Sequence, residues 1–230
     1  MKKVIILHGA LGSKVQFGEL ARLLGAHFTV HVFDFDGHGS KSGSDVKYSI
    51  ELFARNLYDF MRENQIEKPL IFAYSMGGFV ALKLESMCPG SWEQLVTLGT
   101  KFDWTPESAE KETKMLNAEK IEEKVPAFAA YLKSLHGEHE WKKVLERTVG
   151  MMLEMGNEPV LTATDFSKIQ APVQLLRGSG DAMVSEEETK KIQKQLSSSA
   201  YREVSGWQHP INLISPEELT QQLLSLYLPG

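Results

Sequence analysis

The sequence has almost no cysteine and no long apolar run. Cys88 is the only cysteine in 230 residues, so no disulfide can form within the chain, and we expect a reducing, cytoplasmic environment. No apolar segment approaches the roughly 20 residues that span a bilayer, so no membrane span is predicted. The apolar residues 4–7 follow two lysines as in a signal peptide, but the run stops at His8 and no small-residue cleavage site follows.

The sequence also lacks an excess of positive charge. It has 25 basic and 30 acidic side chains, which gives a net charge of −5 at pH 7. Such a chain is poorly suited to binding phosphate backbones, so nucleic acid is not an expected partner. Hydrophobic residues at 42% and charged residues at 24% are ordinary values for a globular protein. A chain of this length buries a large core without disulfides or metals, which predicts one domain, with room for an insertion.

Short apolar runs alternate with amphipathic stretches of helical length. This alternation is typical of a parallel sheet covered by helices on both faces. We therefore predict an α/β fold with about six strands, all parallel. The predicted strands are residues 4–7, 28–35, 70–74, 95–98, 173–176 and 201–204.

Two capping boxes are predicted near the C-terminus. Ser185 with Glu188, and Ser215 with Glu218, each place a hydroxyl at the N-cap of a helix and a carboxylate three positions later. Pro216 is the favoured first residue of the second helix. Each box follows a predicted strand closely.

Residues 101–160 break the alternation. They hold 12 acidic and 9 basic residues, so 35% of this segment is charged, against 24% of the whole chain. No strand-like run occurs there, and two helical stripes of apolar residues do, with Pro126 splitting the first or starting a new helix. We predict a helical insertion over the carboxyl ends of the sheet, between core segments 1–100 and 161–230. The alternative is an extra helical layer packed elsewhere.

The turn Ala73-Tyr74-Ser75-Met76-Gly77-Gly78 carries the strongest chemical signal. It joins a predicted strand to a predicted helix, which lifts Ser75 clear of the sheet. The strained turn needs small residues two positions before and after the serine, and Ala73 and Gly77 supply them. The helix N-terminus also stabilises developing negative charge. The alternative is an ordinary helix N-cap; in this context the pattern favours a nucleophile.

A glycine turn follows the first predicted strand, at His8-Gly9-Ala10-Leu11-Gly12-Ser13. It can direct the Ala10 N–H at the space above Ser75. Together with the Met76 N–H it would form a pair of donors that holds an oxyanion. A lone His-Gly turn is weak evidence, because strand ends commonly carry glycine.

Asp181 and His209 follow the fifth and sixth predicted strands. A serine hydroxyl needs a base within hydrogen-bond reach, and that base needs a carboxylate to fix its tautomer. Ser75, Asp181 and His209 are 106 and 28 residues apart, so only a sheet could bring them together. Each of the last two alone could be an ordinary loop residue. All three at strand ends predict a catalytic triad.

These segments together resemble the alpha/beta-hydrolase superfamily over essentially the whole chain. The resemblance rests on residues 8–12, on Asp36-Gly37-His38-Gly39-Ser40, on the turn around Ser75, and on the order of Ser75, Asp181 and His209. It implies that Ser75 is the nucleophile, His209 the general base and acid, and Asp181 the orienting carboxylate. It also implies an oxyanion hole of Ala10 and Met76 N–H, a cap domain at residues 101–160, and no cofactor.

The sequence departs from relatives at a few positions. Alanine stands at Ala73, where many relatives have glycine. Phe79 stands where relatives such as the lyase of menaquinone synthesis often carry arginine. Some relatives place the carboxylate after the strand that follows the predicted helix beyond Ser75. In this sequence that carboxylate would be Asp103. We favour Asp181, because it lies in a tight glycine turn.

A substrate pocket is predicted between the core and the insertion. We expect Leu11, Trp104, Met151, Met152 and Trp207 to contribute to it. The methionines in or near the insertion, including Met115 and Met155, are expected to pack its interior. The alternative is that they form an adaptable wall for an apolar acyl group.

Two histidines of the insertion do not indicate a metal. His136 and His139 lack the spacing of a zinc-binding helix, so we interpret them as a solvated helix end and predict no metal site.

The function that the resemblance implies is serine-dependent acyl transfer to water. We expect cleavage of a small ester or thioester, with a small-molecule acyl substrate. The alternatives are a triad-dependent lyase, a carbon–carbon hydrolase, or a non-catalytic ligand receptor on the same fold. The sequence does not indicate an oligomeric state.

Overall fold

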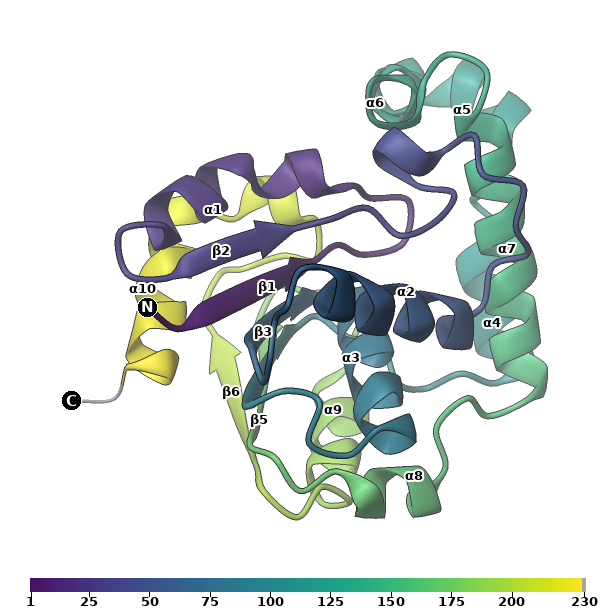
Figure 1. Cartoon of the computed structure of the whole chain (residues 1–230). Helices are drawn as coiled ribbons and strands as arrows, with labels where there is room; N and C mark the ends of the chain where they lie inside the picture. Colours follow the sequence, from purple (N-terminus) through teal and green to yellow (C-terminus); the bar gives the residue numbers. More distant parts are fainter. Residues whose placement is uncertain (229–230) are drawn as a thin grey trace.

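A six-stranded sheet forms the centre of the computed structural model, which describes residues 1–228 (Figure 1). The strand order is β2-β1-β3-β4-β5-β6, and every neighbouring pair is parallel. The predicted parallel α/β sheet is confirmed. The strands are β1 Lys3–Leu7, β2 Thr29–Val32, β3 Leu70–Tyr74, β4 Gln94–Leu98, β5 Val173–Gly178 and β6 Ser199–Val204.

One strand is shorter than the sequence predicts. Strand β2 ends at Val32, whereas the apolar pattern continues to Phe35. The chain leaves the sheet edge there, and the Phe35 N–H donates to Nε2 of His8 at 3.2 Å rather than to a strand. The aromatic residues of this segment remain buried because they pack under helix α2, Ile50–Glu63.

Successive residues of the central strands face opposite layers of helices. In β1, Ile5 and Leu7 pack in the cluster under α2, whereas Val4 and Ile6 pack in the cluster on the other face. Both faces are therefore buried, as continuous apolar strands predict. In Figure 1, α1 and α10 cover one face and α2, α3, α8 and α9 the other. The remaining bounds are α1 Gly18–Leu24, α3 Met76–Met87, α8 Ala163–Lys168, α9 Glu186–Gln193 and α10 Pro216–Tyr227.

Five helices stand between β4 and β5, and we call the first four of them the cap helices. They are α4 Pro106–Thr113, α5 Ala118–Lys124, α6 Pro126–His136 and α7 Trp141–Asn157. Figure 1 shows them beyond the carboxyl ends of β1 and β2. Ile121, Leu132, Trp141 and Leu145 form a small core of their own. Pro126 starts α6, so it breaks the first stripe by beginning a new helix. The division of the chain into a core and a cap of residues 101–160 stays a prediction.

Only one of the two predicted capping boxes is complete. Ser185 accepts from the Glu188 N–H, and the Glu188 carboxylate accepts from the Ser185 N–H. Ser215 caps α10 in the same way, with Pro216 at the first turn, but its reciprocal partner is absent. Glu218 accepts instead from the indole N–H of Trp207 at 3.1 Å. The Glu218 carboxylate therefore binds a buried indole N–H instead of completing the capping box.

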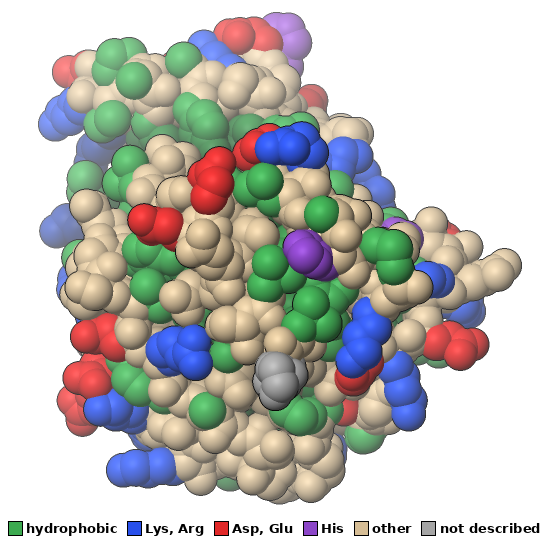
Figure 2. Space-filling view, turned by 90° about the vertical axis from the view of Figure 1, so that its left-hand side faces the viewer, with side chains coloured by type: hydrophobic (Ala, Val, Ile, Leu, Met, Phe, Trp, Pro, Cys, Tyr) green, Lys and Arg blue, Asp and Glu red, His purple; other side chains and the backbone are tan. Residues whose placement is uncertain are grey.

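The surface mixes charges of both signs. Figure 2 shows, on the face that was the left-hand side of Figure 1, acidic and basic side chains interspersed with hydrophobic ones. Such a mixture is typical of a solvated surface. Within residues 1–228, no helix combines the length and the hydrophobicity needed to cross a bilayer.

Candidate active site

Ser75 occupies a strained turn between β3 and α3. Its φ of 51° and ψ of −118° lie in a region that residues other than glycine rarely adopt. The surroundings hold it there: the Ser75 N–H donates to the Leu98 carbonyl at 2.8 Å, and the Thr100 hydroxyl donates to the Ser75 carbonyl at 2.9 Å. A Cβ on Gly77 would lie 2.8 Å from that of Leu7, so a glycine is required at this position.

The three residues predicted as a triad lie within bonding distance of one another. Ser75 Oγ is 3.3 Å from His209 Nε2, and His209 Nδ1 is 2.8 Å from Asp181 Oδ2. The hydroxyl of Tyr74 donates to the His209 carbonyl at 2.9 Å, which anchors the backbone of this loop to β3. The sheet therefore joins a hydroxyl, an imidazole and a carboxylate in one chain of hydrogen bonds.

Asp181 is held as a buried carboxylate. Its Oδ1 accepts from the N–H groups of Met183 and Val184 at 2.9 and 3.0 Å. Burial alone would raise the pKa of Asp181, but the hydrogen bond and charge of His209 and these two N–H groups outweigh it, so the pKa lies below its usual value. Asp103, the alternative acid, is exposed, and the two ring nitrogens of His209 are bonded to Asp181 and Ser75 instead. The geometry therefore favours Asp181 over Asp103 as the carboxylate that orients His209.

Gly99 belongs to this arrangement, and the sequence analysis missed it. It follows β4 directly and has a φ of +63°. A Cβ there would lie 3.1 Å from Asp181 Oδ2 and 3.2 Å from His209 Nδ1. Any other residue would press on the pair of atoms that orients the imidazole. A glycine directly after a predicted strand was the only available signal, and it is a common one.

Within residues 1–228, two residues with unused backbone donors lie beside Ser75. Ala10 and Met76 both line the same pocket as Ser75 and His209. Neither N–H donates to any acceptor within the described part of the chain, residues 1–228. Because Met76 is the first residue of α3, its N–H has no partner inside the helix, and the helix dipole adds to its positive character. These two N–H groups can bind an oxygen that carries negative charge.

His8 fixes the loop that carries Ala10. Its Nδ1 donates to the Gly9 carbonyl at 2.8 Å, and its Nε2 accepts from the Phe35 N–H. Burial lowers the pKa of His8 to about 4, so the ring is neutral near pH 7. The neutral ring is the form that can donate from one nitrogen and accept at the other.

His136 ties the same loop to a cap helix. Its Nδ1 accepts from the Gly39 N–H at 3.0 Å, which places the ring proton on Nε2, and Nε2 donates to the Leu11 carbonyl at 3.0 Å. Leu11 itself has a φ of 58°. The interpretation of His136 as a solvated helix end is wrong, since only 2% of it is exposed. His139 is exposed, as expected.

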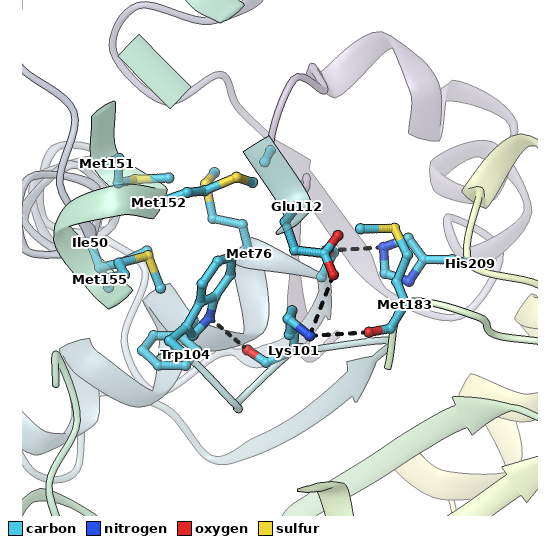
Figure 3. A pocket seen from close by; sticks show the side chains of 13 residues that line it. Ile50, Met76, Lys101, Trp104, Glu112, Met151, Met152, Met155, Met183 and His209 are labelled. Atoms are coloured by element: carbon cyan, nitrogen blue, oxygen red, sulfur yellow. Dashed lines mark hydrogen bonds and ion pairs between the residues drawn. The ribbon is translucent and has the colours of Figure 1, made fainter. Parts of the chain in front are cut away.

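An apolar pocket adjoins Ser75, with about 470 Å³ of space that includes its solvent-open mouth. In Figure 3, the methionines of α7 lie on the opposite side of this pocket from His209. Of the predicted pocket residues, Trp104, Met151 and Met152 line it. Leu11 instead lines an adjoining pocket of about 890 Å³, which also reaches Ser75. The other lining residues of the first pocket are Ala10, Ile50, Met76, Phe79, Lys101, Glu112, Met155, Met183 and His209.

The prediction that Trp207 lines the substrate pocket is wrong, because Trp207 lines neither of these two pockets. Its side chain is buried in the core on the face covered by α1 and α10, and its N–H donates to Glu218. Gly178 has no Cβ and lets the Trp207 backbone pack directly against β5. Met115 also lies outside both pockets, with 74% of its surface exposed. Among residues 1–228, no group of three or more histidine, cysteine or acidic side chains is placed to hold a metal ion.

A family model described as "alpha/beta hydrolase fold" matches residues 2–146, which is more than half of the chain. The chain belongs to the alpha/beta hydrolase family. The resemblance drawn from the sequence is therefore confirmed, and this alpha/beta hydrolase has the sheet order and the strand-to-helix turn described above.

Curated relatives of this alpha/beta hydrolase share modest identity with it. An esterase of Mycobacterium tuberculosis is 24% identical over 218 residues, which cover 84% of this chain and 71% of that protein. A Haemophilus influenzae protein named as an esterase/lipase is 28% identical over 95 residues, or 41% of this chain. That match spans only 33% of the Haemophilus protein, so the chain corresponds to about a third of that relative's length.

Solved structures show the same fold over nearly the full chain. NosK from Streptomyces actuosus superposes with a TM-score of 0.83 at 20% identity, covering 98% of this chain and 97% of NosK. The enol-lactonase from Burkholderia xenovorans LB400 superposes with a TM-score of 0.78 at 15% identity, covering 98% and 91%. At such low identities these likenesses establish the fold alone.

Proposed function

We propose that this alpha/beta hydrolase is a serine hydrolase that cleaves a small ester or thioester through an acyl-enzyme on Ser75. One observation carries the proposal. The hydrogen-bonded chain from Ser75 through His209 to Asp181 opens onto a pocket where the Ala10 and Met76 N–H groups have no partner within residues 1–228. A nucleophile, a base, an orienting acid and two oxyanion donors are the groups that acyl transfer requires.

In the first half of the reaction, Ser75 Oγ attacks the substrate carbonyl while His209 Nε2 takes its proton. Asp181 holds Nδ1–H and steadies the positive charge that forms on the ring. The negative charge on the former carbonyl oxygen is stabilised by the N–H groups of Ala10 and Met76. His209 then gives its proton to the leaving alcohol or thiol, and the acyl group stays on Ser75.

In the second half, water takes the place of the leaving group. His209 removes a proton from the water as it attacks the acyl carbonyl. The tetrahedral species collapses, the proton returns to Ser75 Oγ, and the acid leaves. The same donors serve both halves, so the site needs no rearrangement between them.

The two pockets that meet at Ser75 support cleavage of a two-part substrate. We assign the acyl group to the 470 Å³ pocket lined by methionines, and the leaving group to the larger one lined by Leu11. Unbranched thioether side chains adapt to flexible apolar chains. The relative named as an esterase also favours ester chemistry.

The lyase alternative is less favoured. Phe79 lines the acyl pocket where lyases of this superfamily often carry arginine, so the site offers no guanidinium there for an anionic substrate. The other alternative is a non-catalytic receptor. A receptor on this fold can retain Ser75, Asp181 and His209 and bind a ligand without cleaving it.

A panel of para-nitrophenyl esters and acyl thioesters of graded chain length tests the proposal, with the Ser75→Ala protein as the matched control. The expected result is steady release of many product molecules per wild-type enzyme molecule and almost none from the control. Binding without turnover across the panel would favour the receptor and contradict the proposal.

A further inference from the structure

An ion pair lies in the wall of the apolar pocket. Lys101 Nζ is 3.6 Å from Glu112 Oε1, and the two side chains are only 14% and 16% exposed. Both line the pocket that contains Ser75 and His209. Figure 3 shows the carboxylate and the ammonium facing each other between the Trp104 side and the His209 side of the pocket.

The two partners come from different parts of the fold. Lys101 follows β4 and belongs to the loop that leaves the sheet beside Ser75, whereas Glu112 projects from cap helix α4. The Lys101 ammonium also donates to the Met183 carbonyl, at 3.3 Å. Its positive charge is therefore already paired before any substrate enters the pocket.

We propose that Glu112 determines the charge of the acyl group that this enzyme accepts. This inference rests on the proposed function. Glu112 cancels the charge of Lys101, so the pocket takes uncharged, flexible acyl chains and rejects acyl groups that end in a carboxylate. An unpaired ammonium in an apolar pocket would attract such an anion. With Glu112 present, the anion must either displace a carboxylate or be buried beside it without a partner, and both are unfavourable.

The rest of the pocket agrees with this assignment. Apart from the ion pair and the catalytic groups, the lining is made of methionine, isoleucine, phenylalanine, tryptophan and alanine side chains. These offer dispersion contacts to a hydrocarbon chain and no hydrogen-bond partner for a carboxylate. The indole N–H of Trp104 is already bonded to the Lys101 carbonyl at 3.1 Å.

A purely structural role for the ion pair makes a different prediction. If the pair only joins α4 to the β4 loop, its removal would change turnover of charged and uncharged esters by the same factor. If Glu112 sets specificity, the ratio between the two substrates must change. The ratio of kcat/KM values therefore distinguishes the two roles, whatever happens to the absolute rates.

The experiment compares para-nitrophenyl hexanoate with the para-nitrophenyl monoester of adipic acid, which has the same chain length but ends in a carboxylate. The variant is Glu112→Gln, and the control is Glu110→Gln on the exposed side of the same helix. We expect Glu112→Gln to raise the adipoyl-to-hexanoyl ratio of kcat/KM by about tenfold or more, with a smaller gain at high salt. Glu110→Gln should leave the ratio unchanged.

A double variant identifies the cation responsible. Adding Lys101→Met to Glu112→Gln should abolish the gain for the adipoyl ester. An unchanged ratio in an active Glu112→Gln enzyme, or a wild-type enzyme that prefers the adipoyl ester, overturns the inference and leaves the proposed function standing. Failure of the wild type to hydrolyse either ester contradicts the proposed function, and this inference with it.

Discussion

His136 Nε2 donates a hydrogen bond of 3.0 Å to the carbonyl of Leu11, which follows Ala10 in the loop beside Ser75. The other ring nitrogen accepts from the Gly39 N–H. A single cap-helix side chain thus fixes the backbone of the loop that carries Ala10, whose N–H has no partner within residues 1–228.

We predict that His136 positions this loop for catalysis. His136→Ala leaves the Leu11 carbonyl and the Gly39 N–H without partners and should lower kcat by about 10- to 100-fold, with a smaller effect on KM. His136→Gln keeps one donor and one acceptor and should recover most of that loss. Steady-state kinetics of the three proteins on one ester checks this. Equal kcat in wild type and His136→Ala would refute the positioning role.

Asp181→Asn should reduce turnover far more than stability. The amide preserves the shape of the side chain but stabilises the wrong tautomer of His209. In a well-known serine protease the same type of change lowers kcat by about 10⁴. We expect a loss of that order here, measured as kcat on an aryl ester. The Asp103→Asn protein is the matched control and should keep wild-type turnover. The reverse outcome would make Asp103 the acid.

Gly99→Ala should damage the site through geometry alone. The new methyl group would press on Asp181 and His209, and the backbone angle disfavours alanine by about 1–2 kcal/mol. We expect kcat to fall by up to about 10². Gly150→Ala in helix α7 is the control, since a Cβ there meets open space, and it should raise the free energy of unfolding by about 0.5–1 kcal/mol. Full activity in Gly99→Ala would disprove the close fit.

Folding stability should fall as the pH drops from about 6.5 to about 4. Burial lowers the pKa of His8 to about 4, and it also lowers the pKa values of His38 and His136. Below the ordinary histidine pKa the unfolded chain binds protons that the folded chain does not, so each such histidine removes up to about 1.4 kcal/mol per pH unit until the pH reaches its own folded-state pKa. Asp181, whose pKa is also lowered, acts in the same direction but only below about pH 4.

Urea unfolding at a series of pH values measures this slope. Replacing the buried His8 with glutamine should make the slope shallower, whereas the same change at the exposed His139 should not. A free energy of unfolding that stays constant between about pH 6.5 and about pH 4 would contradict the prediction.

The strands of the sheet were predictable because each is recognised from the apolar residues of one short segment. Central strands buried on both faces appear as continuous apolar runs, and Ser75, Asp181 and His209 lie one, three and five residues beyond the ends of β3, β5 and β6. Their grouping then follows from parallel order alone, since parallel strands bring their carboxyl ends to one edge.

The missed features depend on residues distant in sequence. His136 is bonded to partners 125 and 97 positions away, so nothing around it in the chain indicated burial. The indole N–H of Trp207 donates to the Glu218 carboxylate of helix α10. Because of this bond, Trp207 lies outside the predicted pocket and Glu218 does not complete the predicted capping box. Strand β2 is shorter than its apolar pattern because Phe35 is bonded to a side chain, His8, rather than to a neighbouring strand.

The most direct test of the central claim is the turnover number of Ser75→Ala on the best aryl ester, with folding verified by circular dichroism. Ser75 Oγ is the only atom proposed to form the covalent intermediate. The expected result is a rate lower by about 10⁶, or down to the background of the assay. A folded Ser75→Ala protein that hydrolyses the ester at close to the wild-type rate would contradict the acyl-enzyme mechanism.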